Sequence, residues 1–343
     1  MNDLTQLRVF GRDLDDDLAE LSPALRNRIV SSFEPHSWRA RWLPQPRQNA
    51  PRRRRRPIPV AVLTMLMAAV ICLTALGFWG GTPAADAQAV RILNRAASAA
   101  LRQPAPHIRP SDFVFTRALE MAATITVRNH RPLVSEASVL REQWLSASGR
   151  RKGLLRERPF SILLGHPTGP WNATVLQACV HGHLVPTGSG PFSQGGIGSE
   201  PCHAIPADLR HLPTTEPASR RYLYHHLDGQ NPPDQQAFIT AGDLIRDNYI
   251  RPAALAAIFR AVAHIPGVTV VHGAVSADGR RGIAVQRVYH GISDQLIFDP
   301  QTYAVIGERE VVVGPGTGIK VGTIMDLTTI LAMRIVHNVG HTR

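Results

Sequence analysis

The chain has 343 residues, with 38 Lys and Arg against 26 Asp and Glu, which gives a formal net charge of +12. A basic excess of this size raises nucleic acid or an anionic surface as partners. The excess is spread thinly along the chain, however, except in one run formed by Arg52, Arg53, Arg54, Arg55 and Arg56. This distribution argues against a nucleic-acid partner, and we interpret the run as a membrane-flanking basic cluster.

Residues 57–81, directly after this cluster, carry no charged residue and are mostly apolar. About 20 residues of such a helix rise about 30 Å, the thickness of the hydrocarbon core of a bilayer. The sequence therefore predicts one transmembrane helix here, and the one-sided arginines place the N-terminus in the cytoplasm. Two alternatives stay open, a buried core helix and a secretory signal cleaved near Ala85, although the basic leader is very long for a signal. The expected location is the cell membrane, with the lipid bilayer as a partner.

The span divides the chain into a small cytoplasmic part and a large external part. We expect a short helical segment at residues 1–33, where leucines recur at helical spacing, and a basic, Pro-rich tether at residues 34–56. The helical segment is too small to bury a core, which makes it a candidate for binding a cytoplasmic regulatory protein. Residues 84–343 are expected to form one external domain, with a Gly-, Pro- and His-rich excursion at residues 166–215.

Helical and strand periods follow one another in the external part. Helices are predicted where the pattern suits a helix, at residues 86–101, 234–247 and 252–264. Strands are predicted where β-branched and aromatic residues alternate with polar ones, at residues 113–117, 123–127, 138–146, 153–158, 267–271, 282–289, 294–299 and 303–313. This order of helices and hairpins indicates an α+β fold, a curved antiparallel β-sheet packed by helices.

One contact between these elements is specific enough to name in advance. Phe259 lies on the apolar face of the helix at residues 252–264, while Leu296 and Phe298 share one face of a strand that follows. Because each of these apolar faces has to be covered, we expect the helix to pack on the sheet at these residues.

Residues 249–268 (YIRPAALAAIFRAVAHIPGV), 277–285 (ADGRRGIAV) and 295–302 (QLIFDPQT) resemble an uncharacterised family of actinobacterial single-pass membrane proteins, often encoded beside sigma-factor genes. The resemblance implies the same order of cytoplasmic helices, basic tether, membrane span and external domain, and it suggests a sigma factor as the cytoplasmic partner. It implies no established activity. At the level of fold alone, a curved sheet closed by helices is also similar to lipoprotein carriers and to some envelope-stress regulators.

Two of the three cysteines, Cys179 and Cys202, lie in the excursion. The compartment outside the membrane is oxidising, which favours a disulfide between them, with free thiols as the alternative. His181, His183 and His203 lie close in sequence, but their spacing with the cysteines matches no standard zinc site. We therefore expect neither a metal site nor a cofactor.

The chain contains no motif with catalytic spacing. The Gly-rich residues 314–318 lack the Gly-Lys-Ser/Thr sequence of a phosphate loop and predict a β-turn, while His225 and His226 are expected on a strand with a mixed face. Two classes of function remain. The favoured one is a non-enzymatic envelope protein that binds a ligand or passes a signal to its cytoplasmic partner. The alternative is an extracytoplasmic hydrolase with its groups in residues 166–224.

Overall fold

The computed structural model describes residues 84–128, 131–185, 201–227, 229 and 231–343. The cytoplasmic segment, the tether, the basic cluster and the span predicted at residues 57–81 lie outside these residues. Among the helices that are described, none is long and apolar enough to cross a bilayer. The membrane topology therefore stays a prediction, and the structure concerns the part of the chain that begins at residue 84.

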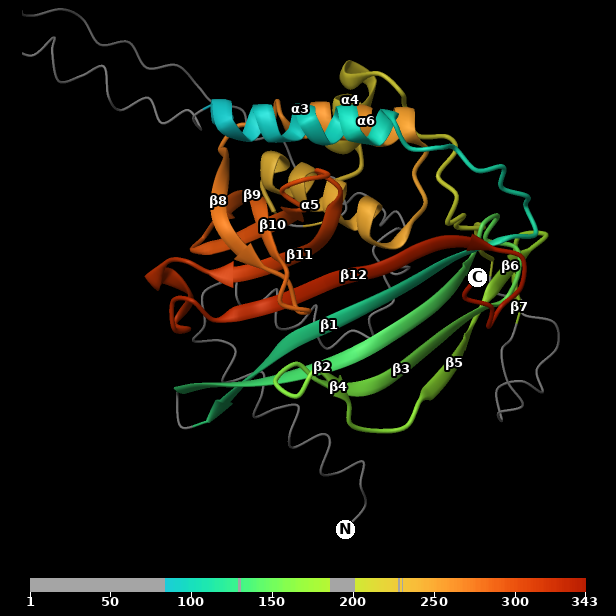
Figure 1. Ribbon diagram of the computed structural model, residues 1–343, viewed down its shortest axis with the longest axis horizontal. Helices are drawn as coiled ribbons and strands as arrows, with labels where there is room; N and C mark the ends of the chain where they lie inside the picture. Colours follow the sequence, from blue (N-terminus) through green and yellow to red (C-terminus); the bar gives the residue numbers. More distant parts are fainter. Residues whose placement is uncertain (1–83, 129–130, 186–200, 228, 230) are drawn as a thin grey trace, which may run out of the picture.

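The described residues form an α+β domain, with helices packed on one large antiparallel sheet (Figure 1), which confirms the predicted class. The helices are α3 (Ala87–Leu101), α4 (Glu216–His225), α5 (Pro233–Asp247) and α6 (Pro252–Val262). The strands are β1 (Phe113–Arg128), β2 (Arg131–Ser146), β3 (Gly153–Ser161), β4 (His166–Pro167), β5 (Asn172–Leu176), β6 (Ala178–Val180), β7 (His183–Val185), β8 (Val268–Val275), β9 (Arg281–Tyr289), β10 (Ile292–Phe298), β11 (Val305–Val312) and β12 (Ile324–Val336).

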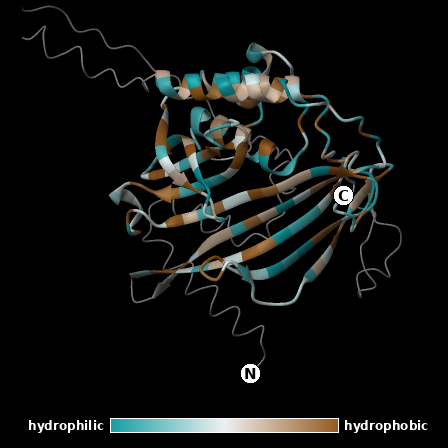
Figure 2. Ribbon diagram, viewed as in Figure 1, coloured by the Kyte–Doolittle hydropathy of each residue, from teal (hydrophilic) through white to brown (hydrophobic). Residues whose placement is uncertain are grey.

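The order of strands in the large sheet is β4-β3-β2-β1-β12-β11-β10-β9-β8, with β5 also paired to β3, while β6 and β7 pair separately. The last strand, β12, lies between β1 and β11. It therefore joins two series of hairpins, one from the N-terminal side of the domain and one from the C-terminal side. Along the long strands, apolar and polar residues alternate, as the bands in Figure 2 show.

Helices cover one face of the β8–β10 part of the sheet. The ring of Phe259 on α6 meets that of Phe298 on β10 edge to face, with 5.7 Å between centroids. Leu296 belongs to the same buried cluster, together with apolar residues of α3, α4, α5 and α6. The predicted packing of this helix on the sheet is confirmed. At the start of α3, the Asp86 amide donates to the carbonyl oxygen of Val268, 2.8 Å away, which fixes the entry of the chain beside β8.

On the opposite face of the sheet, the turn between β8 and β9 folds over and contacts β12. In the β8–β9 turn, the Ala277 amide donates to Thr329 Oγ1 (2.7 Å), and Arg280 donates to the Ile330 carbonyl oxygen (3.2 Å). Two strands, β10 and β11, lie between β9 and β12 in the sheet. The turn reaches across them only because the sheet is curled, in agreement with the predicted curvature.

Three predicted elements differ from the structure. Residues 113–117 and 123–127 belong to one 16-residue strand, β1, because the alanines between them pair with β2 on one side. His225 and His226 end a helix rather than lie on a strand. The predicted β-turn at residues 314–318 is a 3-10 turn at Pro315–Thr317, and Gly318 (φ 69°) ends it in the left-handed region.

Candidate functional site

The excursion that contains the two cysteines is closed by a disulfide and bonded to the turn between β2 and β3. In the structure Cys179 and Cys202 are joined by a disulfide, with their Cα atoms 5.9 Å apart. The Cys179 amide donates to the Gly149 carbonyl oxygen (3.3 Å), and the Cys202 amide donates to that of Gly182 (2.8 Å). These bonds connect the excursion to the β2–β3 turn and to the β6–β7 hairpin. Among the described residues, no group of three His, Cys, Asp or Glu side chains is arranged to hold a metal ion.

The two adjacent histidines belong to the end of α4. The ring of His226 stacks on that of Tyr222, with 4.0 Å between centroids, and its Nδ1 lies 2.9 Å from the Tyr222 carbonyl oxygen. Residues four apart on a helix are neighbours, which explains this contact. The geometry indicates a structural role for His226 at the C-terminal end of the helix.

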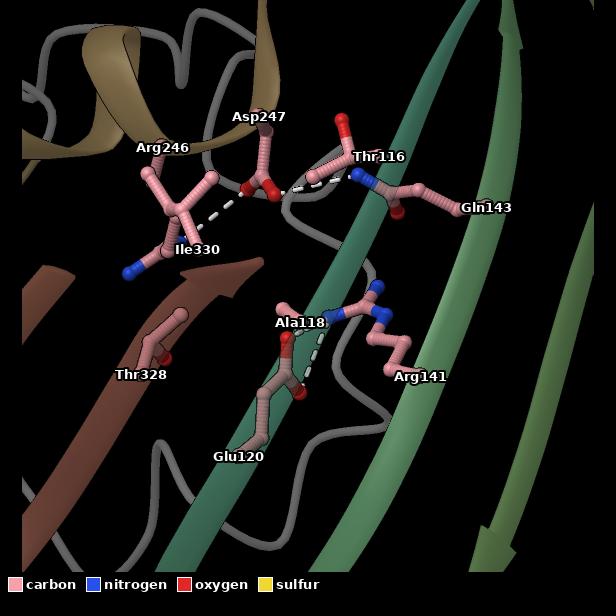
Figure 3. Close-up of a pocket in the computed structure, with 9 residues that line it drawn as sticks. All are labelled: Thr116, Ala118, Glu120, Arg141, Gln143, Arg246, Asp247, Thr328 and Ile330. Atoms are coloured by element: carbon pink, nitrogen blue, oxygen red, sulfur yellow. Dashed lines mark hydrogen bonds and ion pairs between the residues drawn. The ribbon is translucent and has the colours of Figure 1, made fainter. Parts of the chain in front are cut away.

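A polar cluster joins the C-terminal end of α5 to the helix-bearing face of the sheet (Figure 3). Arg141 donates to Glu120 (2.9 Å), Gln143 donates to Asp247 (3.1 Å), and Arg246 lies 3.3 Å from Asp247. These side chains come from β1, β2 and α5, and they leave no room between them for a water molecule. We interpret the cluster as a structural junction between helix and sheet.

Negative charge exceeds positive charge around Arg246 in this junction, because its one guanidinium forms ion pairs with three carboxylates. Arg246 donates to Glu308 (3.1 Å) and to Asp243 (3.0 Å), besides its contact with Asp247. Burial raises the pKa of Glu308 to about 8; Arg246 opposes this rise, while Asp243 and Asp247 add to it. A protonated Glu308 reduces the negative charge that Arg246 has to balance.

A second cluster lies on the opposite face. Arg117, Glu142 and Arg156 stand directly opposite one another on β1, β2 and β3. Gln143 points toward α5, so its neighbour Glu142 points to the other face. The Glu142 side chain is 2% exposed and accepts hydrogen bonds from Arg117 Nε (2.8 Å) and from Arg156. Burial would raise the pKa of Glu142, but these two hydrogen-bonded arginines outweigh burial and hold the pKa below its usual range.

Two tryptophan rings lie beside the arginines of this cluster. The guanidinium carbon of Arg156 lies 5.1 Å from the ring centroid of Trp144 and 4.9 Å from that of Trp171, and Arg158 lies 4.4 Å from Trp171. Arg156 and Arg158 share a face because they are two residues apart on β3. Within the described part of the chain, the buried Nε atoms of both arginines have no hydrogen-bond partner. We call this set, Arg117, Arg156, Arg158, Trp144 and Trp171, the arginine–tryptophan surface.

Two segments border the arginine–tryptophan surface. On one side the chain after β12 folds back, and Trp144 Nε1 donates to the His341 carbonyl oxygen (2.5 Å). On the other side, the β8–β9 turn reaches Thr329, whose strand neighbour is Leu119 on the same face as Arg117. Between these segments the side chains of Arg117 and Arg156 remain 41% and 32% exposed. Three arginines against one carboxylate leave the surface with positive charge.

The arrangement suits an anionic group attached to a flat or apolar body. A guanidinium that stacks on a ring keeps its N–H edge directed outward, where it binds a carboxylate, sulfate or phosphate. Residue patterns alone do not reveal this surface, because it is assembled by the register of three strands. The local signal in the sequence is the alternation Arg156-Glu157-Arg158, which places two cations on one face of a strand.

Comparison with known proteins does not assign the chain to a family. No family model matches it, and no curated protein matches its sequence. Among solved structures, "Crystal structure of MucB" matches with a TM-score of 0.26 and 12% identity, over 75% of this chain and 62% of that one. "The complex structure of Pseudomonas aeruginosa MucA/MucB" gives 0.25 and 10%, over 75% and 59%. The chain thus spans less than two thirds of either structure, and TM-scores this low do not establish a shared fold.

Proposed function

We propose that the chain is a non-enzymatic binding protein of a bacterial envelope, anchored by the span predicted at residues 57–81. Its external domain binds an anionic ligand at the arginine–tryptophan surface. The observation that carries the proposal is the stacking of partly exposed arginines on two tryptophan rings, held in place by one buried carboxylate. No observation among the described residues favours the hydrolase alternative.

The ligand class follows from the chemistry of this surface. Arg156 is held by its hydrogen bond to Glu142 and by contacts with the rings of Trp144 and Trp171, so little side-chain entropy remains to be lost on binding. Arg158 stacks on Trp171 alone, and we assign it the main contact with the ligand anion. The partly exposed ring of Trp171 offers apolar contact to the rest of the ligand, while the ring of Trp144 is fully buried and supports Arg156 from within.

Binding of phenyl phosphate to the full chain in nanodiscs of neutral lipid tests this proposal, with tryptophan fluorescence as the readout. Arg158→Gln removes a charged hydrogen-bond donor, which is typically a loss of about 1.5–3 kcal/mol or tenfold or more in affinity. Arg260→Gln, an exposed arginine on α6, is the control and should bind as the unaltered chain does. Equal affinity in all three proteins would refute the assignment of the surface.

The membrane placement has its own test. Cysteines at Gln45 and at the exposed Glu136 should react with an impermeant thiol reagent from opposite sides of the membrane. Reaction of both from one side would rule out the proposed topology.

The cytoplasmic side of the proposal concerns residues 1–33. The family resemblance supports a regulatory partner there, such as a sigma factor, to which the external domain would report its ligand. Co-purification from cells, compared between the full chain and a variant that lacks residues 1–33, tests this link. Recovery of the same cytoplasmic proteins with both chains would contradict it.

A further inference from the structure

The turn between β3 and β4 displays three consecutive aliphatic side chains to solvent. Ile162 is 39% exposed, Leu163 94% and Leu164 61%. Each of these side chains would be more favourable in an apolar environment, at roughly 25 cal/mol per Å² of area removed from water. Adjacent exposed aliphatic residues of this kind indicate a contact surface, whereas scattered ones need no explanation.

The backbone of the turn fixes this exposure. The Gly165 amide donates to the Ser161 carbonyl oxygen (2.8 Å), and the Leu164 amide donates to Ser161 Oγ (3.2 Å). Gly165 has φ 72°, in the left-handed region where glycine is favoured. Because β3 and β4 pair at the base of the turn, the three side chains project from a closed loop.

Along the sequence, a long uncharged segment contains the turn, and two arginines come just before it. Residues 159–199 contain no Lys, Arg, Asp or Glu. Trp171 and the partly buried Phe160 both pack against the buried cluster that contains Leu119 and Leu140, and Arg158 stacks on Trp171. An aliphatic tip, then aromatic rings, then cations is the order in which side chains meet a membrane: hydrocarbon, interface and anionic headgroups.

We propose that residues 161–165 form a membrane-surface contact, in which Ile162, Leu163 and Leu164 enter the outer layer of the bilayer. The position of the domain favours lipid as the occupant. The predicted span ends at residue 81, and Asp86 is already bonded to Val268 beside β8. The few residues between them reach at most about 20 Å, which holds the β8 end of the sheet close to the bilayer. Because β4 lies at the other end of the strand order, the turn meets the same bilayer with the sheet lying along it. This inference rests on the anchored topology of the proposed function and is independent of the anionic ligand.

Site-directed quenching tests the contact in the full chain. Leu163→Cys is compared with Leu101→Cys, a 49% exposed leucine at the end of α3, both with Cys72→Ala so that only the new thiol reacts. Each is labelled with nitrobenzoxadiazole in phosphatidylcholine vesicles, with or without phosphatidylglycerol. Lipid-borne doxyl groups should quench the label at 163 several-fold more than at 101, and aqueous iodide should show the reverse preference. Phosphatidylglycerol should strengthen lipid quenching at 163.

Two results would overturn the proposal. Equal quenching at 163 and 101 would show that the turn stays in water. Self-quenching at 163 that grows with protein density, without quenching by lipid, would assign the turn to a contact between copies of the chain.

A paired variant separates this inference from the ligand site. Leu163→Asn should lose insertion, seen as an exposed label at Ile162→Cys, yet retain its affinity for phenyl phosphate. Arg158→Gln should lose that affinity yet keep lipid quenching in phosphatidylcholine. Loss of both properties in either variant, with near-UV circular dichroism unchanged, would contradict the separation of the two surfaces.

Discussion

The two parts of the large sheet are stabilised by different interactions. The β8–β10 part is covered by helices through an apolar cluster that includes Phe259 and Phe298. The β1–β3 part carries ion pairs on both faces, Arg141 with Glu120 on one and Arg156 with Glu142 on the other. Apolar burial commits a face to the core, whereas partly exposed charges remain free to meet a ligand. The candidate site accordingly lies on the face of the β1–β3 part that points away from α5.

The largest effect is expected from breaking the apolar half. Phe259→Ala removes a ring that is 2% exposed and leaves a cavity beside Phe298, which should lower the free energy of unfolding by about 3–5 kcal/mol. Urea unfolding of the reconstituted chain measures this. Leu133→Ala, at a 57% exposed position, is the control and should change little. A small loss for Phe259→Ala would mean that the helices contribute less to this half than the packing indicates.

The disulfide should have the next largest effect, because it closes a loop beside the charged half with a sequence separation of 23. In the chain-entropy model such a loop contributes about 3 kcal/mol, which Cys179→Ser with Cys202→Ser should remove. Non-reducing peptide mapping of protein from the envelope fraction checks the bond directly. Two free thiols there would show that the bond does not form in the cell.

A smaller loss should follow from changing the charged half. Glu142→Gln leaves Arg117 and Arg156 without their shared carboxylate, but both arginines are partly exposed and regain water. We expect a loss of about 1–2 kcal/mol in the free energy of unfolding, together with weaker binding of phenyl phosphate because the arginines are no longer positioned. Glu136→Gln, at an exposed position of the same strand, should change neither. Full retention of binding by Glu142→Gln would show that the arginines do not need this carboxylate.

The last expected effect concerns how stability changes with pH, rather than its value at one pH, and it arises at the helix–sheet junction. The pKa of Glu308 is about 8 in the folded chain, against an ordinary value of 4.5, so the folded state binds this proton more tightly. Its contribution to stability is therefore complete below about pH 4.5 and is lost as pH rises through about 8. The Glu308→Gln variant has no such group to titrate. Its free energy of unfolding, measured relative to that of the unaltered chain, should therefore rise with pH between about 4.5 and 8, by at most about 1.4 kcal/mol per pH unit. Parallel stability curves from pH 5 to 8 would contradict the raised pKa.

Sequence patterns were sufficient where one period dominates. The apolar face of α6 and the alternation in β9 and β10 predict both the elements and the contact of Phe259 with Phe298. They failed where local residues suit more than one structure: Tyr222 and His226 are compatible with a strand, but their four-residue spacing places them together on α4. β12 was not predicted, because its residues are stabilised as a strand by pairing with β1 and β11, which lie far from one another in the sequence.

The candidate site was beyond sequence patterns for a related reason. Arg117, Glu142 and Arg156 come from three strands, and only the register of those strands places them in one row. Trp171 joins them from the connection between β4 and β5. The exposed turn has a local signal, since residues 159–199 lack charged residues, yet burial of those residues inside a core would give the same pattern.

The position of β12 has a consequence for biogenesis. A ribosome delivers β1 about 200 residues before β12 (Ile324–Val336), yet β1 and β11 both take β12 as their neighbour. Until that strand arrives, each half presents an open strand edge that invites pairing with other chains. The nascent protein therefore needs protection from aggregation until β12 has been made, and a ribosome that stops before Ile324 releases two unjoined half-sheets.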